Sequence, residues 1–545
     1  MSQKDRLGTG GRINRAIPLT FTFNGRTYQG FQGDTLASAL LANGVHFVAR
    51  SFKYHRPRGI VTADVAEPNA VVQLETGPYT VPNARATEIE LYQGLVATSV
   101  NAEPTLENDK YAINQKFSRF MPAGFYYKTF MWPRNMWPKY EEKIREAAGL
   151  GKAPEVLDAD RYDKCYAHCD VLVVGGGPSG LAAAHAAATA GARVILVDDQ
   201  RELGGSLLSC RAEIDAKPAL QWVEKIEAEL RKLPDVTILS RSTAFGYQDH
   251  NLVTVTQRLT DHLPVSMRKG TRELLWKVRA KRVILATGAH ERPIVFGNND
   301  LPGVMLAGAV STYVHRFGVL PGRNVVVFTN NDRAYQSALD LKACGAKVTV
   351  VDSRASSNGA LPAAAKRQGV TVMSGAVVTA ASGKWRVSSV DVASYSNGQT
   401  GGKLRRCRAT SSRCRAASAR CCTCSRNRAA RRAGTTRRRA SCRASPCRRK
   451  RASGRRPANS GWPVRCGSRS MRAWKRRRPP ASPPRSARPC RRSPKPSKAR
   501  CSRCGSSAVA RRPRAARSSS STSRTTWRPP TSCSPRAKAS SRSST

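Results

Sequence analysis

Residues 170–200 read DVLVVGGGPSGLAAAHAAATAGARVILVDDQ, and this stretch decides the fold of the chain. An apolar strand leads into Gly175, Gly177 and Gly180, and an alanine-rich helix and a second apolar strand follow. In this motif the first glycine permits a tight turn, the second lets the backbone approach a pyrophosphate, and the third allows helix and strand to pack closely. The order of elements predicts a β–α–β dinucleotide-binding unit.

Two acidic residues at the end of the second predicted strand narrow the choice of cofactor. Asp198 lies 18 residues after Gly180, near the position where an acid accepts a hydrogen bond from a ribose hydroxyl. Asp199 adds a second negative charge, which would repel a 2′-phosphate. The pattern therefore favours NAD or FAD over NADP, and its alternative is a degenerate Rossmann unit that binds nothing.

Three further segments extend this α/β region. Residues 201–207, RELGGSL, place two glycines before Ser206, in a turn that either passes near the cofactor phosphates or is a plain loop. Residues 283–293, VILATGAHERP, run a strand into an Ala-Thr-Gly turn, where the chain leaves the first domain in two-dinucleotide-domain flavoproteins. Residues 322–354 repeat the strand–helix–strand plan, but their turn has no glycine. We expect this second unit to keep the Rossmann-like fold without holding a cofactor.

The N-terminal residues predict a small β-grasp domain. Two short strands flank Asn24-Gly25, a favoured hairpin turn, and a helix closed by Gly44 follows. Ferredoxin-type domains begin in this way, but they hold their cluster with cysteines. Residues 1–164 contain no cysteine, so we expect a ferredoxin-like domain without a cluster, serving as a structural or docking module.

Other candidate chemistry is sparse. No C-x-x-C follows either dinucleotide motif, which argues against a thiol–disulfide reductase, and Cys165 and Cys169 are expected to be inert. No Ser–His–Asp set or metal cluster stands out, and His55 is expected to be structural. We therefore assign no catalytic residue and no metal ligand.

Composition divides the chain sharply. Of the 93 Lys and Arg residues, 45 lie in residues 403–545, which contain no Asp or Glu and hold twelve of the 16 cysteines. The preceding residues carry 48 basic and 36 acidic side chains, a net charge of +12. That part is cysteine-poor, has no secretory signal and has no apolar run of the ~18 residues that a membrane helix needs. We expect a cytoplasmic protein that has no membrane contact.

Residues 51–60, SFKYHRPRGI, and 121–133, MPAGFYYKTFMWP, precede the glycine motif. In this order, and with the Ala-Thr-Gly segment, they resemble the α subunit of heterotetrameric sarcosine oxidase over roughly residues 12–400. The resemblance implies an α/β fold with two Rossmann-like units and NAD at the first glycine motif, with FAD as the alternative in the same site. The residues implied to contact the cofactor are Gly175, Gly177, Ser179, Gly180, Asp198, Asp199, Gln200 and Ser206, with Ala244 on the adenine side.

The resemblance also implies partners and a reaction. The family oxidises sarcosine to glycine, with hydrogen peroxide and either formaldehyde or methylene-tetrahydrofolate as further products. Its β, γ and δ subunits would be the partners, and FMN or FAD in a partner subunit would carry the flavin chemistry. The tetrahydrofolate site belongs to a C-terminal domain that the basic tail replaces here.

The predicted division of the chain follows from these segments. It comprises a β-grasp domain at 12–100, a connector at 101–167, a first dinucleotide-binding unit at 168–320, a second Rossmann-like unit at 321–402, and an arginine-rich tail at 403–545. The first unit is expected to be incomplete, because in this fold the chain returns from the second unit to finish the first.

The tail reads as an out-of-frame translation that begins near residue 403. A GC-rich gene read in the wrong frame yields such mixtures of Arg, Ala, Ser, Pro and Cys. Residues 409–424 and 520–533 can be back-translated with suitable codons. When the reading frame of both is shifted by the same offset, they read CDLVAMSGGFSPVLHL and FVDLQNDVAAADIL, which resemble segments of the family. We therefore expect a frameshifted, truncated and inactive form of the α subunit.

Two alternative functions remain. One is the related subunit of an opine oxidase or a cyanide-forming oxidase, which would bind FAD and often a cluster; the missing cysteines argue against the cluster-bearing members. The other is a basic protein that binds nucleic acid non-specifically through its tail, with a steep salt dependence.

Overall fold

The computed structural model describes residues 3–121, 132–149, 151–408, 415–416 and 419–420. All described residues belong to one compact unit. The aromatic segment predicted within the connector lies largely outside the described residues, as does almost all of the predicted tail.

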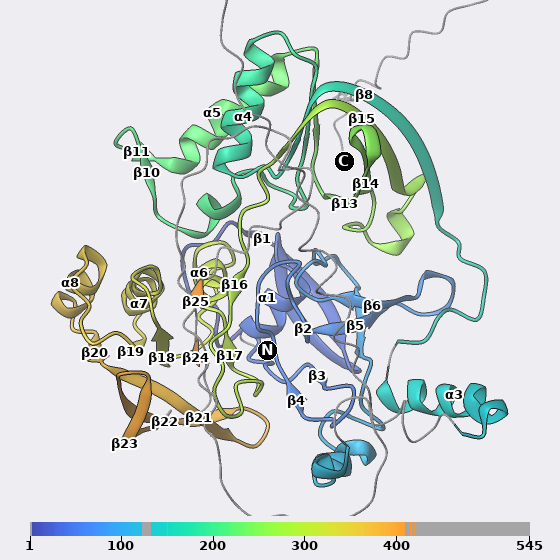
Figure 1. Cartoon of the computed structure of the whole chain (residues 1–545). Helices are drawn as coiled ribbons and strands as arrows, with labels where there is room; N and C mark the ends of the chain where they lie inside the picture. The colour runs from blue at the N-terminus through green and yellow to red at the C-terminus, as the bar shows by residue number, and fades with distance from the viewer. Residues whose placement is uncertain (1–2, 122–131, 150, 409–414, 417–418, 421–545) are drawn as a thin grey trace, which may run out of the picture. The chain divides into compact units, whose positions relative to one another are not determined.

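The N-terminal region forms a five-stranded sheet in the order β2-β1-β7-β5-β6 (Figure 1). Its strands are β1 (Asn14–Phe23), β2 (Arg26–Gln32), β5 (Val71–Leu74), β6 (Val81–Arg85) and β7 (Val96–Ser99), with β3 (Ala49–Arg50) and β4 (Pro57–Arg58) paired separately. The β1–β2 hairpin turns at Asn24 and Gly25, both with positive φ, as a two-residue turn requires. The predicted hairpin is confirmed.

The predicted helix of this region is α1 (Leu36–Ala42), and every residue in it is buried. Thr35 caps its N-terminus, because the Thr35 hydroxyl accepts from the Ser38 amide while the Ser38 hydroxyl accepts from the Thr35 amide. The core around α1 is continuous with buried side chains of the C-terminal half, among them Tyr313 and Val327. The small domain therefore shares its core with the second Rossmann-like unit.

The connector contains a helix, α3 (Trp137–Ala148), which ends at Gly149 in the left-handed region. The predicted start of the first unit at residue 168 is too late, because the strand β8 (Arg161–Val174) begins seven residues earlier. Residues 161–169 are mostly polar, so they lack the apolar run that marks a buried strand. Pairing with the distant strand β15 (Thr271–Leu285) holds them in the sheet instead.

The first dinucleotide-type unit is a six-stranded sheet in the order β12-β9-β8-β15-β14-β13. The strands β8, β9, β12 and β15 are parallel, whereas β13 and β14 are antiparallel additions at the edge. Helices α4 and α5 pack against each other beside the sheet, as Figure 1 shows. The bounds not yet given are β9 (Val194–Val197), β12 (Val236–Leu239), β13 (Ser242–Gln248), β14 (Leu252–Arg258), α4 (Pro178–Thr189), α5 (Ala219–Lys232), β10 (Glu213–Ile214) and β11 (Lys217–Pro218).

The second unit contains a three-stranded parallel sheet and a three-stranded antiparallel sheet. The parallel strands are β18 (Asn324–Thr329), β19 (Lys347–Asp352) and β20 (Thr371–Ser374), with helices α7 (Arg333–Ala343) and α8 (Ala360–Arg367) between them. The antiparallel strands are β21 (Ala376–Gly383), β22 (Val387–Ser396) and β23 (Gln399–Arg408). The predicted strand–helix–strand repeat is thus present.

Shorter elements precede and follow this unit. They are β16 (Glu291–Arg292), β17 (Val304–Met305), α6 (Ala307–His315), β24 (Arg415–Ala416) and β25 (Ala419–Arg420). Residues 403–408, the first of the predicted tail, belong to β23, which pairs with β22 through Arg408. Its backbone hydrogen bonds with β22 are independent of side-chain type, so composition does not reveal them.

The described residues are informative about membrane and metal binding. Every helix described is too short or too polar to cross a bilayer. The same residues contain no group of three or more His, Cys, Asp or Glu side chains placed to hold a metal ion.

Candidate dinucleotide-binding site

The glycine loop between β8 and α4 is held tightly by its neighbours. Gly175 has φ +106°, and a Cβ added there would lie 2.4 Å from the Ala286 carbonyl oxygen, just beyond β15. A Cβ added at Gly180 would lie 1.8 Å from the Gly175 carbonyl oxygen. No larger residue fits either position without a backbone shift, so both glycines are required by this loop.

The N-terminus of α4 faces a less crowded region. Gly177 is the N-cap residue, with no side-chain cap, and a Cβ added there would meet nothing closer than Gly205 Cα at 3.9 Å. Pro178 and Ser179 open the first turn, whose free amides and positive dipole end suit an anion. Gly177 and Ser179, both predicted to contact the cofactor, therefore lie at a helix N-terminus with enough open space for a pyrophosphate.

Asp198 lies directly against the glycine loop. It follows β9, is only 8% exposed, and accepts hydrogen bonds from the Gly176 amide at 2.5 Å and the Gln200 amide at 2.9 Å. Burial, and then the charge of Asp199, raise the pKa of Asp198 to about 6, although both backbone amides oppose the rise. The carboxylate is thus ionised at neutral pH, yet it titrates much closer to neutrality than an exposed aspartate.

The two residues after Asp198 are fixed by distant parts of the chain. The Asp199 carbonyl oxygen accepts from Arg258 Nη2 at 3.1 Å. The Gln200 side-chain oxygen accepts from Arg316 Nη1 at 2.7 Å, and Arg316 follows helix α6. Arg316 is largely buried, and its burial lowers the pKa of the guanidinium. The acidic loop is therefore braced from outside the β–α–β unit.

The turn at 204–206 contacts the glycine loop. The Gly204 amide donates to the Gly176 carbonyl oxygen at 2.8 Å, and a Cβ added at Gly205 would lie 2.8 Å from Gly177 Cα. Ser206 follows in a short 3-10 helix, Gly205–Ser209. Of the predicted residues, Ser206 is thus carried by a turn in direct contact with the glycine loop.

Ala244 is the predicted residue farthest along the chain from the motif. It lies on β13, and the Ser242 amide two residues earlier donates to the Asp198 carbonyl oxygen at 2.7 Å. Ala244 itself is partly buried and packs against a core that includes Ile195 and Val197. The structure thus carries Ala244 on a strand that is bonded to the acidic loop.

Several residues that shape this site were not among the predicted ones. Ala286 closes over Gly175, Leu203 lies against Gly176, and Arg316 reaches Gln200. The Ala-Thr-Gly turn after β15 was a usable signal for Ala286, because β15 pairs with β8 up to the glycine loop. Arg316 had no comparable signal, since its sequence neighbours carry no motif.

The corresponding loop of the second unit is differently built. Asp332 stands at the N-terminus of α7, where a phosphate would have to approach, and its carboxylate is paired with Arg354 at 2.7 Å. Asp352, at the end of β19, is fully buried and accepts from the Tyr335 hydroxyl at 2.8 Å and from Arg354. Both carboxylates thus have hydrogen-bond or ion-pair partners within the protein. This supports the expectation that the second unit holds no cofactor.

Two family models match the chain. Residues 16–102 match the 2Fe-2S iron-sulfur cluster binding domain, and residues 170–284 match the FAD dependent oxidoreductase domain. The first match covers a segment with no cysteine, so its residues do not fit a thiolate-held cluster. The second match covers the glycine loop and Asp198, so this α/β segment is similar to an FAD dependent oxidoreductase domain.

Curated relatives extend the match beyond single domains. The alpha subunit of sarcosine oxidase from Rhizobium meliloti strain 1021 is 54% identical over 64% of this chain and 36% of the relative. Its counterpart of the same name from Corynebacterium sp. strain U-96 is 38% identical over 75% of this chain and 38% of the relative. An opine oxidase subunit from Agrobacterium tumefaciens strain Ach5 is 32% identical over 34% of this chain and 37% of the relative.

The chain therefore spans little more than a third of the length of the sarcosine oxidase subunits that it matches. Over the matched 64% of its own length, this chain is 54% identical to the Rhizobium meliloti subunit. In that part the chain is a homologue of sarcosine oxidase alpha subunits.

Proposed function

We propose that this chain is the dinucleotide-holding part of a sarcosine oxidase alpha subunit, and that NAD occupies the site at the first glycine loop. The observation that carries the proposal is the contact of Asp198 with the Gly176 amide, which brings the proposed ribose-binding acid to the proposed pyrophosphate loop. The 54% identity to an alpha subunit supports the same assignment.

Each predicted residue has a role that its position permits. Gly175, Gly177 and Gly180 bring backbone close to the pyrophosphate, and the Ser179 amide at the start of α4 faces its charge. Asp198 accepts from the ribose hydroxyls, and Asp199 opposes a 2′-phosphate. The remaining proposed contacts, to the adenosine end and the phosphates, are Gln200, Ser206 and Ala244.

FAD is the alternative cofactor in this site, and the FAD dependent oxidoreductase model favours it. NAD and FAD share an ADP moiety, and the glycine loop with Asp198 addresses only that shared part. The proposal for NAD rests on the resemblance to the family, in which the flavin chemistry lies in partner subunits. When bound, either cofactor would supply a redox group, while the residues described here bind and orient it.

The proposed assembly has β, γ and δ partner subunits, with FMN or FAD in a partner. In it sarcosine would be oxidised to glycine, with hydrogen peroxide and formaldehyde or methylene-tetrahydrofolate as further products. The tetrahydrofolate site would lie outside the part of the alpha subunits that this chain matches, and we propose that the chain alone is inactive. The cytoplasm is the proposed location.

We further propose that the N-terminal β-grasp domain holds no iron–sulfur cluster. Its support is the absence of cysteine from residues 1–164. Iron analysis and visible spectroscopy of the purified chain test this directly. A stoichiometric cluster bound through the β-grasp domain would contradict it.

The origin of the basic segment has its own proposal, a frameshift close to residue 403. Resequencing the gene through the codons for residues 395–410 and past the stop decides it. A single inserted or deleted base, with a repaired frame that continues well past residue 545, is the expected result. If the frame is confirmed and the alternative frame is closed by stops, the segment needs a function of its own, and non-specific nucleic-acid binding with steep salt dependence becomes the leading candidate.

Binding measurements test the cofactor assignment. NAD and FAD are titrated separately into the full chain by calorimetry, with Asp198→Asn as the variant and Asp249→Asn, in a turn of β13–β14, as the matched control. We expect one NAD site whose affinity falls about tenfold in Asp198→Asn, because a charged hydrogen bond is lost. Tighter binding of FAD would select the alternative cofactor and, with it, an opine-oxidase-like subunit. Failure of both cofactors to bind would overturn the proposal.

A further inference from the structure

Arg316, which directly follows helix α6, is a buried arginine that forms no ion pair with the described residues. Only 7% of its surface is exposed, and its Nε atom is buried without a hydrogen-bond partner in the same part of the chain. Its Nη1 atom donates to the Gln200 side-chain oxygen at 2.7 Å. Glu202, Glu90 and Asp198 are close enough to attract the guanidinium without pairing with it. A buried charge is normally paired with an opposite charge, so this contact with a neutral amide indicates a role other than neutralisation.

The position of Arg316 is fixed by its own backbone. Its amide donates to the Thr312 carbonyl oxygen at 2.8 Å, and its carbonyl oxygen accepts from the Arg12 amide at 2.6 Å. The guanidinium also lies over the Phe317 ring, 5.5 Å from the ring centroid. Because Arg316 is anchored in this way, it holds a hydrogen-bonded partner in one place instead of moving with it.

The side-chain amide of Gln200 joins Arg316 to Asp199. Its oxygen accepts from Arg316, while its Nε2 donates to Asp199 Oδ1 at 3.3 Å. A guanidinium has only donors and a carboxylate only acceptors, so an amide between them has one possible orientation. With its oxygen toward Arg316, the amide must turn its NH2 group toward Asp199. Arg316 therefore decides which end of the Gln200 side chain meets the carboxylate.

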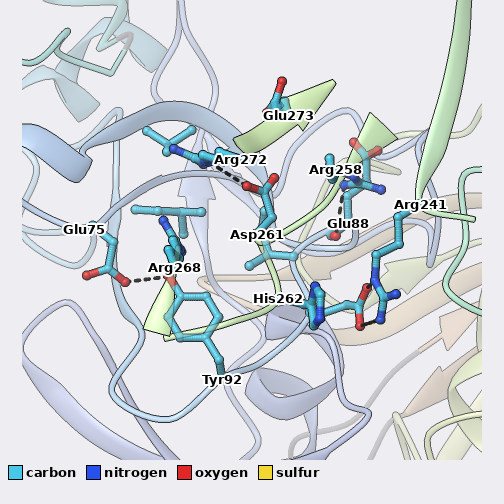
Figure 2. A pocket seen from close by; sticks show the side chains of 14 residues that line it. Glu75, Glu88, Tyr92, Arg241, Arg258, Asp261, His262, Arg268, Arg272 and Glu273 are labelled. Atoms are coloured by element: carbon cyan, nitrogen blue, oxygen red, sulfur yellow. Dashed lines mark hydrogen bonds and ion pairs between the residues drawn. The ribbon is translucent and has the colours of Figure 1, made fainter. Parts of the chain in front are cut away.

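The backbone of the acidic loop is held separately, by two arginines that line the pocket drawn in Figure 2. Arg258 donates to the Asp199 carbonyl oxygen at 3.1 Å through Nη2 and to the Glu88 carbonyl oxygen at 3.4 Å through Nη1. The Arg241 amide donates to the Gln200 carbonyl oxygen at 2.9 Å. These contacts fix the path of the loop but leave its two side chains free to rotate.

The Asp199 carboxylate depends on this amide for its position. Asp199 is partly exposed, and the Gln200 amide is the one donor to its carboxylate that the described residues provide. A carboxylate that can turn away weakens its repulsion of a phosphate, because the interaction between two charges falls with distance. A carboxylate that is held keeps its charge in place. Discrimination against a 2′-phosphate therefore depends on how firmly the amide holds Asp199.

We propose that Arg316 is a specificity-determining residue of the dinucleotide site, which holds the Asp199 carboxylate, through Gln200, in the position that opposes a 2′-phosphate. Arg316 is a positioning residue, because it acts through another side chain. The inference rests on the proposed dinucleotide function and concerns only the adenosine end, which NAD and FAD have in common.

The primary experiment compares two probes, ADP-ribose and 2′-phospho-ADP-ribose, titrated separately into the full chain by calorimetry. Both lack nicotinamide and flavin, so the ratio of their dissociation constants reports the 2′-position alone. In the wild type we expect 2′-phospho-ADP-ribose to bind at least about thirtyfold more weakly, because like charges meet. In Arg316→Met we expect this ratio to fall about tenfold, because the carboxylate is free to turn away. The 45 basic residues in 403–545 attract phosphates in every variant, so the change in the ratio is the readout.

The other outcomes are distinct. A guanidinium that attracted the 2′-phosphate directly would make the ratio rise in Arg316→Met, and either a rise or an unchanged ratio would overturn the inference alone. If ADP-ribose itself does not bind to the wild type, the proposed dinucleotide function fails, and this inference fails with it.

Arg272→Met is the matched control. Arg272 is also 7% exposed, but it lies on β15 and pairs with Asp160 and Asp261 instead of the acidic loop. Its substitution should lower the melting temperature without changing the ratio. If the ratio falls equally in Arg272→Met, the effect of Arg316→Met is general destabilisation and the inference is wrong.

Two further variants separate orientation from charge and from folding. Gln200→Met interrupts the link but keeps the charge of Arg316, so the ratio should fall as it does in Arg316→Met. Asp199→Asn removes the charge that is held, and adding Arg316→Met to it should change the ratio by less than about twofold, because the two residues act through one network. An unchanged ratio in Gln200→Met, or independent effects in the double variant, would contradict the link.

Discussion

The two strand-to-helix loops of this chain share a plan but differ in what fills them. After β8, three glycines leave the start of α4 open, and the carboxylate of Asp198 lies beside the loop. After β18, the carboxylate of Asp332 occupies the start of α7. Asp352, which ends β19, accepts hydrogen bonds from Tyr335 and Arg354. The same topology thus leaves one loop open and fills the other with internal hydrogen bonds and ion pairs.

The difference teaches where to look for function in duplicated folds. Parallel pairing fixes the path of the backbone in both units, so the path alone carries no information about a ligand. The useful distinction is whether polar groups at the strand ends are satisfied by the protein itself. Asp352 is satisfied, whereas Asp198 is held only by backbone amides, and its burial raises its pKa.

The largest expected effect comes from the first loop. Gly180→Ala would place a methyl group 1.8 Å from the Gly175 carbonyl oxygen, and neither backbone can yield cheaply. We expect a loss of about 3 kcal/mol in the free energy of unfolding and loss of dinucleotide binding. Chemical denaturation and calorimetry measure the two effects. Gly8→Ala, where an added Cβ meets nothing within 4 Å, is the control and should be nearly neutral.

The two strand-end acids should respond in opposite directions. Asp352→Asn leaves Arg354 with one partner fewer and should cost about 2 kcal/mol of stability, without altering cofactor affinity. Asp198→Asn removes a charge that burial disfavours and should stabilise the cofactor-free chain by about 1 kcal/mol at pH 7. Urea titrations of both variants decide the matter, and shifts of the same sign would erase the contrast between the loops.

Titration of Asp198 provides the next effect. Ribose hydroxyls donate to the ionised carboxylate, so dinucleotide affinity should fall as pH falls through about 6, and should be about tenfold weaker one pH unit below. The free energy of unfolding should change in the opposite direction with pH. Because the pKa of Asp198 is raised in the folded chain, its contribution to stability is fully present at low pH and is lost as pH rises through about 6. Calorimetry from pH 5 to 8 on the wild type, with Asp198→Asn expected to be flat, checks both statements.

The smallest expected effect lies in the second loop. Asp332→Ala removes a carboxylate whose ion pair with Arg354 is partly exposed, so we expect a cost below about 1 kcal/mol. The loop still lacks glycines, so dinucleotide binding should stay at one molecule per chain. Stoichiometry by calorimetry is the measurement. A second bound dinucleotide in Asp332→Ala would mean that one carboxylate alone separates the two loops.

Local pattern predicted the elements around the first loop well. The three glycines and the 18-residue spacing to Asp198 follow from one short stretch of chain, and so did the β1–β2 hairpin and α1. Long-range pairing was not predictable in the same way. The first half of β8 carries a polar sequence and is a strand only because β15 lies beside it.

The candidate site shows the same division between local and distant information. Spacing identified Asp198, but its burial and its contact with the Gly176 amide depend on Leu203 and on the turn at 204–205. Arg316 approaches Gln200 from a helix more than a hundred residues further on. No motif marks such a residue, because its role depends on where the chain has returned in space.

Arg258 connects the cysteine-free small domain to the acidic loop. Arg258 donates to the Glu88 carbonyl oxygen of that domain and to the Asp199 carbonyl oxygen of the acidic loop, and the neighbouring Arg241 is clasped by Glu90. Excision of the β-grasp domain would therefore strip support from the loop that carries Asp198. A small domain that has no cysteine to hold a cluster can thus still have a structural role, because its contacts support the conformation of the neighbouring acidic loop.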